Sequence, residues 1–204
     1  MSDYTHDFYT QYATYLVEPR VREVHDFALR ALAGGPAFQG NVLDLGCGLR
    51  EFNAYHEWHS GYVGVDELSQ RADIRFNYRS RPELSCLVGG DFKPSAAVSL
   101  FSSEVTASAC VNWTFYNHLF IDFPSLQSML VSGFYYRDGR ERMEKVQEAG
   151  GVESYQTIQP IECFINEQSK ALIEETARLV LPCPSEMFGQ YPVEVWRLLE
   201  RKDV

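Results

Sequence analysis

Three acidic residues each stand at the end of a short apolar run, which is where a parallel sheet places ligand-binding groups. Asp44 lies near the end of the first run, Asp66 directly follows the second, and Asp91 follows the third after two glycines. The intervals between them each fit one strand–helix unit, so we expect the three carboxylates at one edge of a sheet. Like charges gathered in this way repel one another unless a ligand or donor compensates them.

A nucleoside with a cationic tail would compensate these acids. Asp66 would accept hydrogen bonds from the two ribose hydroxyls, as the acid after the second strand does in dinucleotide-binding folds. Asp91 could accept from the adenine amino group, and Asp44 could order an ammonium group, directly or through water. Between the first two acids, Gly46 and Gly48 would let the backbone approach the ligand without an intervening Cβ.

Phosphate-containing ligands fit this turn less well. The dinucleotide pattern G-x-G-x-x-G requires a small residue where this chain has Glu51, and a pyrophosphate at the following helix would face that carboxylate. The Walker pattern is also missing from the sequence. These features favour a ligand without phosphates over nicotinamide dinucleotides and nucleoside triphosphates.

Three strings of the chain carry a family resemblance: Val42-Leu43-Asp44-Leu45-Gly46-Cys47-Gly48, Gly64-Val65-Asp66 and Gly89-Gly90-Asp91-Phe92. They resemble the first three motifs of class I S-adenosylmethionine-dependent methyltransferases. The resemblance covers roughly residues 41–135 by motif and the whole chain by element order. It implies S-adenosylmethionine as the cofactor, and it implies cofactor contacts at Asp44, Leu45, Gly46, Cys47, Gly48, Asp66, Glu67, Asp91, Phe92 and Ser102.

The chain departs from the family pattern at one position of the turn. The family usually has a third glycine two residues after the second, and here that position is Arg50. An arginine at this point could crowd the methionine end of the cofactor or reach a carboxylate.

The order of apolar runs and helical patterns predicts an α/β fold. We expect a Rossmann-like, doubly wound sheet of about seven mostly parallel strands, with an antiparallel last strand and helices on both faces. The whole chain, 1–204, is predicted to be one domain with N-terminal helices in 1–35 and a helical insertion in 160–190. The predicted strands are 41–45, 62–65, 86–88, 96–101, 129–135, 152–158 and 193–199, and the main predicted helices are 19–32, 51–58, 103–120, 138–149 and 166–180.

Catalytic residues are harder to identify, because methyl transfer needs a base only when the acceptor must lose a proton. Glu104, His118 and Tyr12 are the candidates, and each also has a structural interpretation as a helix-start charge, a packing histidine or a core-facing ring. Cys47 is interpreted as a small packing residue. His56 and His59 have no third ligand nearby, so no metal site is predicted.

Composition narrows the partners and the compartment. The net charge of -10 argues against nucleic acid as a partner. An odd number of cysteines, 5, without C-x-x-C spacing indicates reduced thiols. No apolar run reaches the roughly 18 residues of a membrane helix, and the N-terminus lacks a signal sequence, so we expect a cytoplasmic protein away from membranes.

The sequence therefore predicts methyl transfer from S-adenosylmethionine to a small-molecule acceptor. Two alternatives stay open: a non-catalytic domain that binds the cofactor as a sensor or partner subunit, and aminopropyl transfer from the decarboxylated cofactor. The acceptor, the acceptor atom and the oligomeric state are not predicted.

Overall fold

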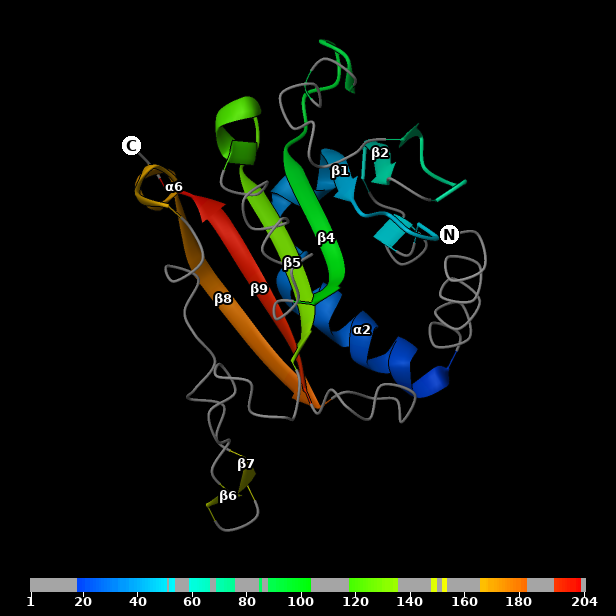
Figure 1. Cartoon of the computed structure of the whole chain (residues 1–204), viewed down its shortest axis with the longest axis vertical. Helices are drawn as coiled ribbons and strands as arrows, with labels where there is room; N and C mark the ends of the chain where they lie inside the picture. The colour runs from blue at the N-terminus through cyan, green and yellow to red at the C-terminus, as the bar shows by residue number, and fades with distance from the viewer. Residues whose placement is uncertain are drawn as a thin grey trace.

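A central sheet of seven strands in the order β3-β2-β1-β4-β5-β9-β8 organises the computed structural model of the chain (Figure 1). The structure describes residues 18–50, 52–53, 59–66, 69–75, 85, 88–103, 118–135, 148–149, 152–153, 166–182 and 193–202. The strands of the sheet are β1 (Asn41–Leu45), β2 (Gly61–Asp66), β3 (Ile74–Arg75), β4 (Ala96–Ser103), β5 (Ser128–Tyr135), β8 (Ile173–Pro182) and β9 (Val193–Arg201). The helices whose bounds the structure describes are α2 (Pro19–Leu32), α6 (Glu167–Leu172) and the 3-10 turn η1 (Pro36–Gln39).

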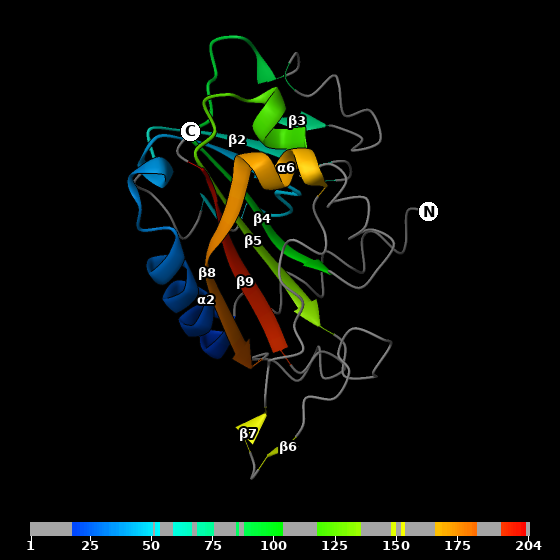
Figure 2. The ribbon, with the colours of Figure 1, turned by 90° about the vertical axis from the view of Figure 1, so that its left-hand side faces the viewer.

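The directions of the strands confirm the predicted fold class. β1 pairs in parallel with β2 and β4, β2 with β3, and β4 with β5. The last strand, β9, runs antiparallel to both of its neighbours, β5 and β8. Helix α2 lies on one side of the sheet and α6 on the other (Figure 2). This is the Rossmann-like arrangement that the element order predicts.

Both faces of the sheet are buried. Successive side chains of each strand point to opposite sides, so each strand contributes apolar side chains to the packing on both faces. In β1, Val42 packs with α2 residues such as Leu29, while the next residue, Leu43, packs on the other face with Leu119. Helix α2 begins with Pro19 in its first turn, and its buried side chains recur at helical spacing: Val21, His25, Ala28, Leu29 and Leu32.

The third strand of the sheet is not where the sequence predicts it. β3 is the pair Ile74–Arg75, within a stretch predicted to be irregular, and it lies beside β2. Val88, the one described residue of the strand predicted over 86–88, is helical, and residues 86 and 87 lie outside the described residues. An apolar run of three residues fits a buried helix as well as a strand. Partly buried Ile74 instead supplies the contact of this strand with the core.

The sixth strand of the sheet also differs from the prediction. The expected helix over 166–180 ends early: α6 stops at Leu172, and β8 begins at Ile173, so the predicted helical insertion contains a strand of the sheet. The predicted helix start is correct, since the side chain of Asn166 accepts a hydrogen bond from the Ser169 backbone N–H at 2.9 Å. Pairing with β9 along nearly the whole of β8 outweighs the helical pattern of its apolar residues.

Two further predictions between β5 and α6 are corrected. The described part of the predicted strand 152–158 is β7 (Val152–Glu153), which pairs only with β6 (Glu148–Ala149) in a separate two-stranded sheet. Ala149 therefore lies in a strand and not in the predicted helix 138–149. Earlier in the chain, Ser103, predicted to cap a helix, is the last residue of β4, and the residues that directly follow it lie outside the described residues. No helix in the described residues is long and apolar enough to cross a membrane.

Arg201, at the end of β9, binds backbone carbonyls in and after the helical stretch 118–122, which precedes β5. Arg201 donates from Nε to the Leu126 carbonyl at 2.8 Å, and from Nη2 to the Phe120 and Phe123 carbonyls at 2.7 and 3.4 Å. These carbonyls include the end of the helical turn 118–122, whose last acceptors have no partner within the helix. One charged side chain thus satisfies three backbone acceptors.

Replacing Arg201 with alanine is expected to lower the free energy of unfolding by about 2 kcal/mol, because three carbonyls lose a charged donor. Urea denaturation measures this change. Arg30→Ala is the matched control: Arg30 forms an exposed i,i+4 pair with Asp26 at 2.9 Å, and its loss should change stability by less than about 0.5 kcal/mol. Equal effects of the two substitutions would contradict the capping role of Arg201.

Candidate ligand-binding site

The turn that follows β1 has the open backbone that its glycines predict. Gly46 and Gly48 adopt positive φ angles of 69° and 50°, in the left-handed region that suits glycine. The backbone N–H groups of Gly46 and Cys47 donate to the Val65 carbonyl of β2 at 2.8 and 3.0 Å, which holds the turn against the carboxyl end of that strand. Gly46 is exposed and Cys47 is buried, in agreement with the packing interpretation of the cysteine.

Asp66 ends β2 directly beside this turn. Its Oδ2 accepts from the Gly48 N–H at 3.1 Å, and its Oδ1 accepts from the Ser69 N–H at 2.8 Å. The Ser69 hydroxyl in turn donates to the Gly48 carbonyl at 2.5 Å. Each carboxylate oxygen can accept a second hydrogen bond, so Asp66 keeps acceptor capacity for a pair of hydroxyls.

Asp44 is a buried acid at the base of the turn. Its pKa is raised from the ordinary 3.8 to about 7: burial raises it most, the hydrogen bond from Tyr62 lowers it, the charge of nearby Asp66 raises it, and the charge of Arg50 lowers it. The Tyr62 hydroxyl donates to Asp44 Oδ2 at 2.5 Å. Because the pKa is higher in the folded than in the unfolded chain, the folded protein loses stability as the pH rises between these two values. Asp44 therefore does not stabilise the fold at neutral pH.

Tyr62 remains a neutral donor to that acid. Its burial raises the pKa of the phenol far above its ordinary range, and the charge of Asp44 and the hydrogen bond between them raise it further. The ring also lies close to His59, with ring centroids 5.6 Å apart. Burial lowers the pKa of His59.

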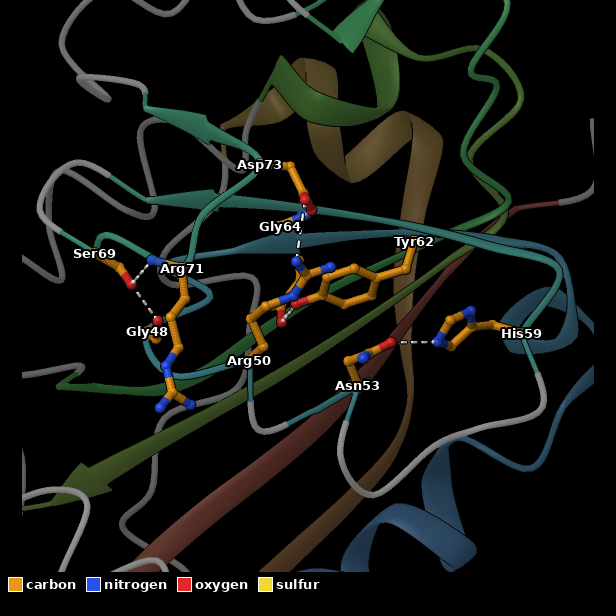
Figure 3. A network of polar contacts seen from close by, with 10 residues as sticks. Gly48, Arg50, Asn53, His59, Tyr62, Gly64, Ser69, Arg71 and Asp73 are labelled. Carbon is orange, nitrogen blue, oxygen red and sulfur yellow. Dashed lines mark hydrogen bonds and ion pairs between the residues drawn. The ribbon is translucent and has the colours of Figure 1, made fainter.

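The side chain of Arg50 points toward Asp73 and Gly64 (Figure 3). Its Nη1 lies 3.0 Å from Asp73 Oδ1, and its guanidinium carbon lies 4.6 Å from the centre of the Tyr62 ring. Asp73 also accepts from the Gly64 N–H through its other oxygen, at 2.8 Å. Of the two possibilities predicted for Arg50, the structure shows the second: it reaches a carboxylate.

Gly64 makes the contact between Tyr62 and Asp44 possible. The register of β1 and β2 pairs Asp44 with Gly64, so Tyr62, two residues earlier on the same face, must lean along the strand to reach the acid. A Cβ on Gly64 would stand 3.1 Å from Tyr62 Cε1 and 3.0 Å from Cys47 Sγ. Sequence analysis missed Tyr62; the available signal was a Tyr-x-Gly string in the strand beside the acid.

Asp91 and Phe92 do not join the other predicted cofactor residues. Phe92 lies beside the start of β2, where its Cε2 would be 3.8 Å from a Cβ on Gly61. The Lys93 carbonyl accepts from Asn41 at the start of β1, at 3.3 Å, and β4 begins soon afterwards. This segment therefore lies at the amino ends of the strands. The structure does not bring Asp91 together with Asp44 and Asp66; residues 86 and 87 of the strand predicted to carry Asp91 lie outside the described residues.

The described part of the structure places none of the catalytic candidates at the glycine turn. Glu104 and Tyr12, like the predicted cofactor contact Glu67, lie outside the described residues. Ser102 lies in β4, where its backbone pairs with that of Gly133 in β5. Its side chain lies outside the described part of the structure. His118 is the first described residue of the helical stretch 118–122, where Arg201 binds the Phe120 carbonyl, and it is half-buried. No group of three metal-ligating side chains occurs among the described residues.

Comparison with known proteins gives structural but not sequence relatives. No family profile and no curated protein matches the chain. The Burkholderia thailandensis 1,6-didemethyltoxoflavin-N1-methyltransferase, crystallised with 1,6-didemethyltoxoflavin and S-adenosylhomocysteine, aligns over 99% of this chain and 87% of its own, with 16% identity and a TM-score of 0.52. The N-methyltransferase NodS from Bradyrhizobium japonicum WM9, in complex with S-adenosylhomocysteine, covers 96% of this chain and 98% of its own at 12% identity and a TM-score of 0.49. With its sheet order and its antiparallel β9, the chain has the Rossmann-like fold of class I S-adenosylmethionine-dependent methyltransferases.

Proposed function

We propose that this protein binds S-adenosylmethionine at the turn after β1 and transfers its methyl group to a small-molecule acceptor. One observation carries the proposal: the buried carboxylate of Asp66 stands at the carboxyl end of β2, beside a left-handed glycine turn at the carboxyl end of β1. In open α/β sheets, ligands bind outside these strand ends. The acid suits a ribose diol, and the turn suits close approach by the rest of the ligand.

The chemistry of the surrounding residues fits this cofactor. S-adenosylmethionine carries a sulfonium and an ammonium group, and the acids Asp44 and Asp66 favour positive charge beside the turn. In this proposal Asp66 binds the ribose hydroxyls, Asp44 attracts the ammonium group, and the backbone of Leu45, Gly46, Cys47 and Gly48 contacts the methionine portion. Glu67 and Ser102 are retained as proposed contacts from the motif resemblance.

The role of the protein in the reaction is then mainly to bind and orient. When bound, S-adenosylmethionine supplies an electrophilic methyl group whose leaving group is a neutral thioether. The residues around the turn hold the adenosine and methionine portions, so that an acceptor can approach the methyl carbon in line with the breaking carbon–sulfur bond. A lone pair of the acceptor forms the new bond, and the electrons of the old bond go to sulfur. No described residue is assigned as a base.

A small-molecule acceptor is supported by charge and by the structural comparison. The chain has a net charge of -10, which opposes binding to a phosphate backbone. The structural neighbour from Burkholderia thailandensis was crystallised with a small heteroaromatic compound. Neither observation selects the acceptor atom.

The test is methyl transfer from methyl-labelled S-adenosylmethionine to a cell extract separated into small molecules, protein and RNA. We expect label in the small-molecule fraction, together with formation of S-adenosylhomocysteine. Label in RNA alone would overturn the proposed acceptor class. Cofactor binding without label in any fraction would favour a binding protein, and product formation only with the decarboxylated cofactor would favour aminopropyl transfer.

A further inference from the structure

Arg50 occupies a backbone conformation that ordinary residues avoid. Its φ angle of 68° makes it the one non-glycine residue with positive φ among those that the structure describes. For a residue with a Cβ, this conformation costs roughly 1–2 kcal/mol. Such strain persists where surrounding contacts enforce it, and it concentrates at functional sites.

We propose that Arg50 is a positioning residue, which fastens the glycine turn to β2 and keeps Asp44 an anionic partner for the ammonium group of the cofactor. The inference rests on the proposed function and concerns the same site. It assigns a role to the position where the resembled family usually has glycine.

The side chain of Arg50 forms two connections from the turn to β2. The first runs through Asp73, which binds the guanidinium with one oxygen, at 3.0 Å, and the Gly64 N–H with the other, at 2.8 Å. The second runs through the Tyr62 ring, 4.6 Å from the guanidinium carbon, to Asp44. The backbone N–H of Arg50 also donates to the Cys47 carbonyl at 2.6 Å, which closes the turn itself. These contacts hold the turn in one position.

The charge of Arg50 opposes the two influences that would neutralise Asp44. Burial disfavours the charged form of this acid, and so does the negative charge of Asp66 on the neighbouring strand. The guanidinium and the Tyr62 hydroxyl favour the charged form. The charged and titratable groups around this acid in the described structure are Asp66 and Tyr62 of β2, Cys47 and Arg50 of the turn, Asp73 before β3, and His59 beside the Tyr62 ring.

This arrangement predicts that pH changes the contact between Asp44 and the ammonium group of the ligand, but not the contacts of its adenosine portion. An ammonium group gains from Asp44 when the acid is ionised and much less when it is protonated. Because the pKa of Asp44 is about 7, the affinity for S-adenosylhomocysteine should rise as the pH increases through neutrality. Adenosine lacks the ammonium group, so its affinity should be nearly independent of Asp44. The ionisation of the ligand's own amine is the same in every titration, so it cannot cause a difference between the variants.

The experiment measures the affinity of S-adenosylhomocysteine and of adenosine across the neutral pH range for the wild type, Arg50→Gln, Arg50→Gly and Arg50→Lys. Without the cation, the midpoint of the pH profile for S-adenosylhomocysteine should move to higher pH, because the charge of Arg50 lowers the pKa of Asp44. The affinity at pH 7 should then fall by about two- to fivefold. Arg50→Lys should restore much of the wild-type midpoint. Arg30→Gln, at an exposed arginine of α2 that pairs with Asp26, is the matched control and should leave the profile unchanged.

The outcomes separate this inference from the proposed function. If the wild type binds S-adenosylhomocysteine and the midpoint is the same in Arg50→Gln and Arg50→Gly, the inference is overturned and the proposed cofactor stands. If the wild type binds neither S-adenosylhomocysteine nor S-adenosylmethionine, the proposed function itself fails. A purely structural role would weaken adenosine and S-adenosylhomocysteine equally without moving the midpoint, which would also overturn the inference. Arg50→Gly relieves the backbone strain, so it provides a folded variant for the comparison.

Discussion

Replacing Asp66 with alanine is expected to weaken binding of S-adenosylhomocysteine by about 100-fold or more, because two hydroxyl hydrogen bonds to a charged acceptor are lost together. The substitution also leaves the Gly48 and Ser69 N–H groups without the carboxylate that joins them. The turn would then lose both its ligand contact and one of its attachments to β2. Isothermal calorimetry on the purified variant measures the change.

The control for Asp66 is an acid of similar size away from the turn. Asp26 lies on α2 in an exposed pair with Arg30, so Asp26→Ala should leave ligand affinity unchanged. Asp66→Asn should fall between alanine and the wild type, since the amide oxygen still accepts one backbone hydrogen bond. Circular dichroism identifies variants that fail to fold. A folded Asp66→Ala variant with wild-type affinity would show that the ribose site lies elsewhere.

Replacing His25 with leucine is expected to lower the free energy of unfolding by about 3–5 kcal/mol, because it leaves a buried carboxylate without its partner. His25 Nε2 lies 3.2 Å from Glu194 Oε2, and both side chains have no exposed surface. The pair joins α2 to β9, with the His25 ring against Trp196 at 5.5 Å between centroids. Chemical denaturation in urea measures the loss.

A double-mutant cycle shows whether the charge is the cause. The variant His25→Leu/Glu194→Leu removes both polar groups, and it should recover much of the stability lost in His25→Leu alone. If the double variant is less stable than His25→Leu by the full cost of Glu194→Leu, the two side chains act independently. That result would contradict the proposed pairing energy.

Strands with an apolar run of their own could be predicted from the sequence, whereas those defined by pairing could not. β1, β2, β4, β5 and β9 each contain such runs, and their predicted positions agree with the structure. β3 has two residues, and β8 has a pattern that also fits a helix, so both depend on a neighbouring strand for their identity. Pairing energy is not visible in a local window of sequence.

The same limit applies to the candidate site. Gly46, Gly48, Asp44 and Asp66 could be predicted because the chain's own order places them at the ends of adjacent strands. Tyr62 and Asp73 reach the site only through the register of β1 with β2 and through the position of β3. Asp91 does not lie with them in the described structure, and its predicted place depended on a strand over 86–88 of which only Val88, a helical residue, is described.

The most direct test of the proposed function is a calorimetric titration of the purified protein with S-adenosylmethionine, S-adenosylhomocysteine and NAD. We predict binding of the first two at about micromolar Kd, or about -8 kcal/mol, and no binding of NAD. This result would establish S-adenosylmethionine as the cofactor, and the Asp66 variants would then locate its site at the turn. Binding of NAD, or binding of none of the three ligands, would contradict the account.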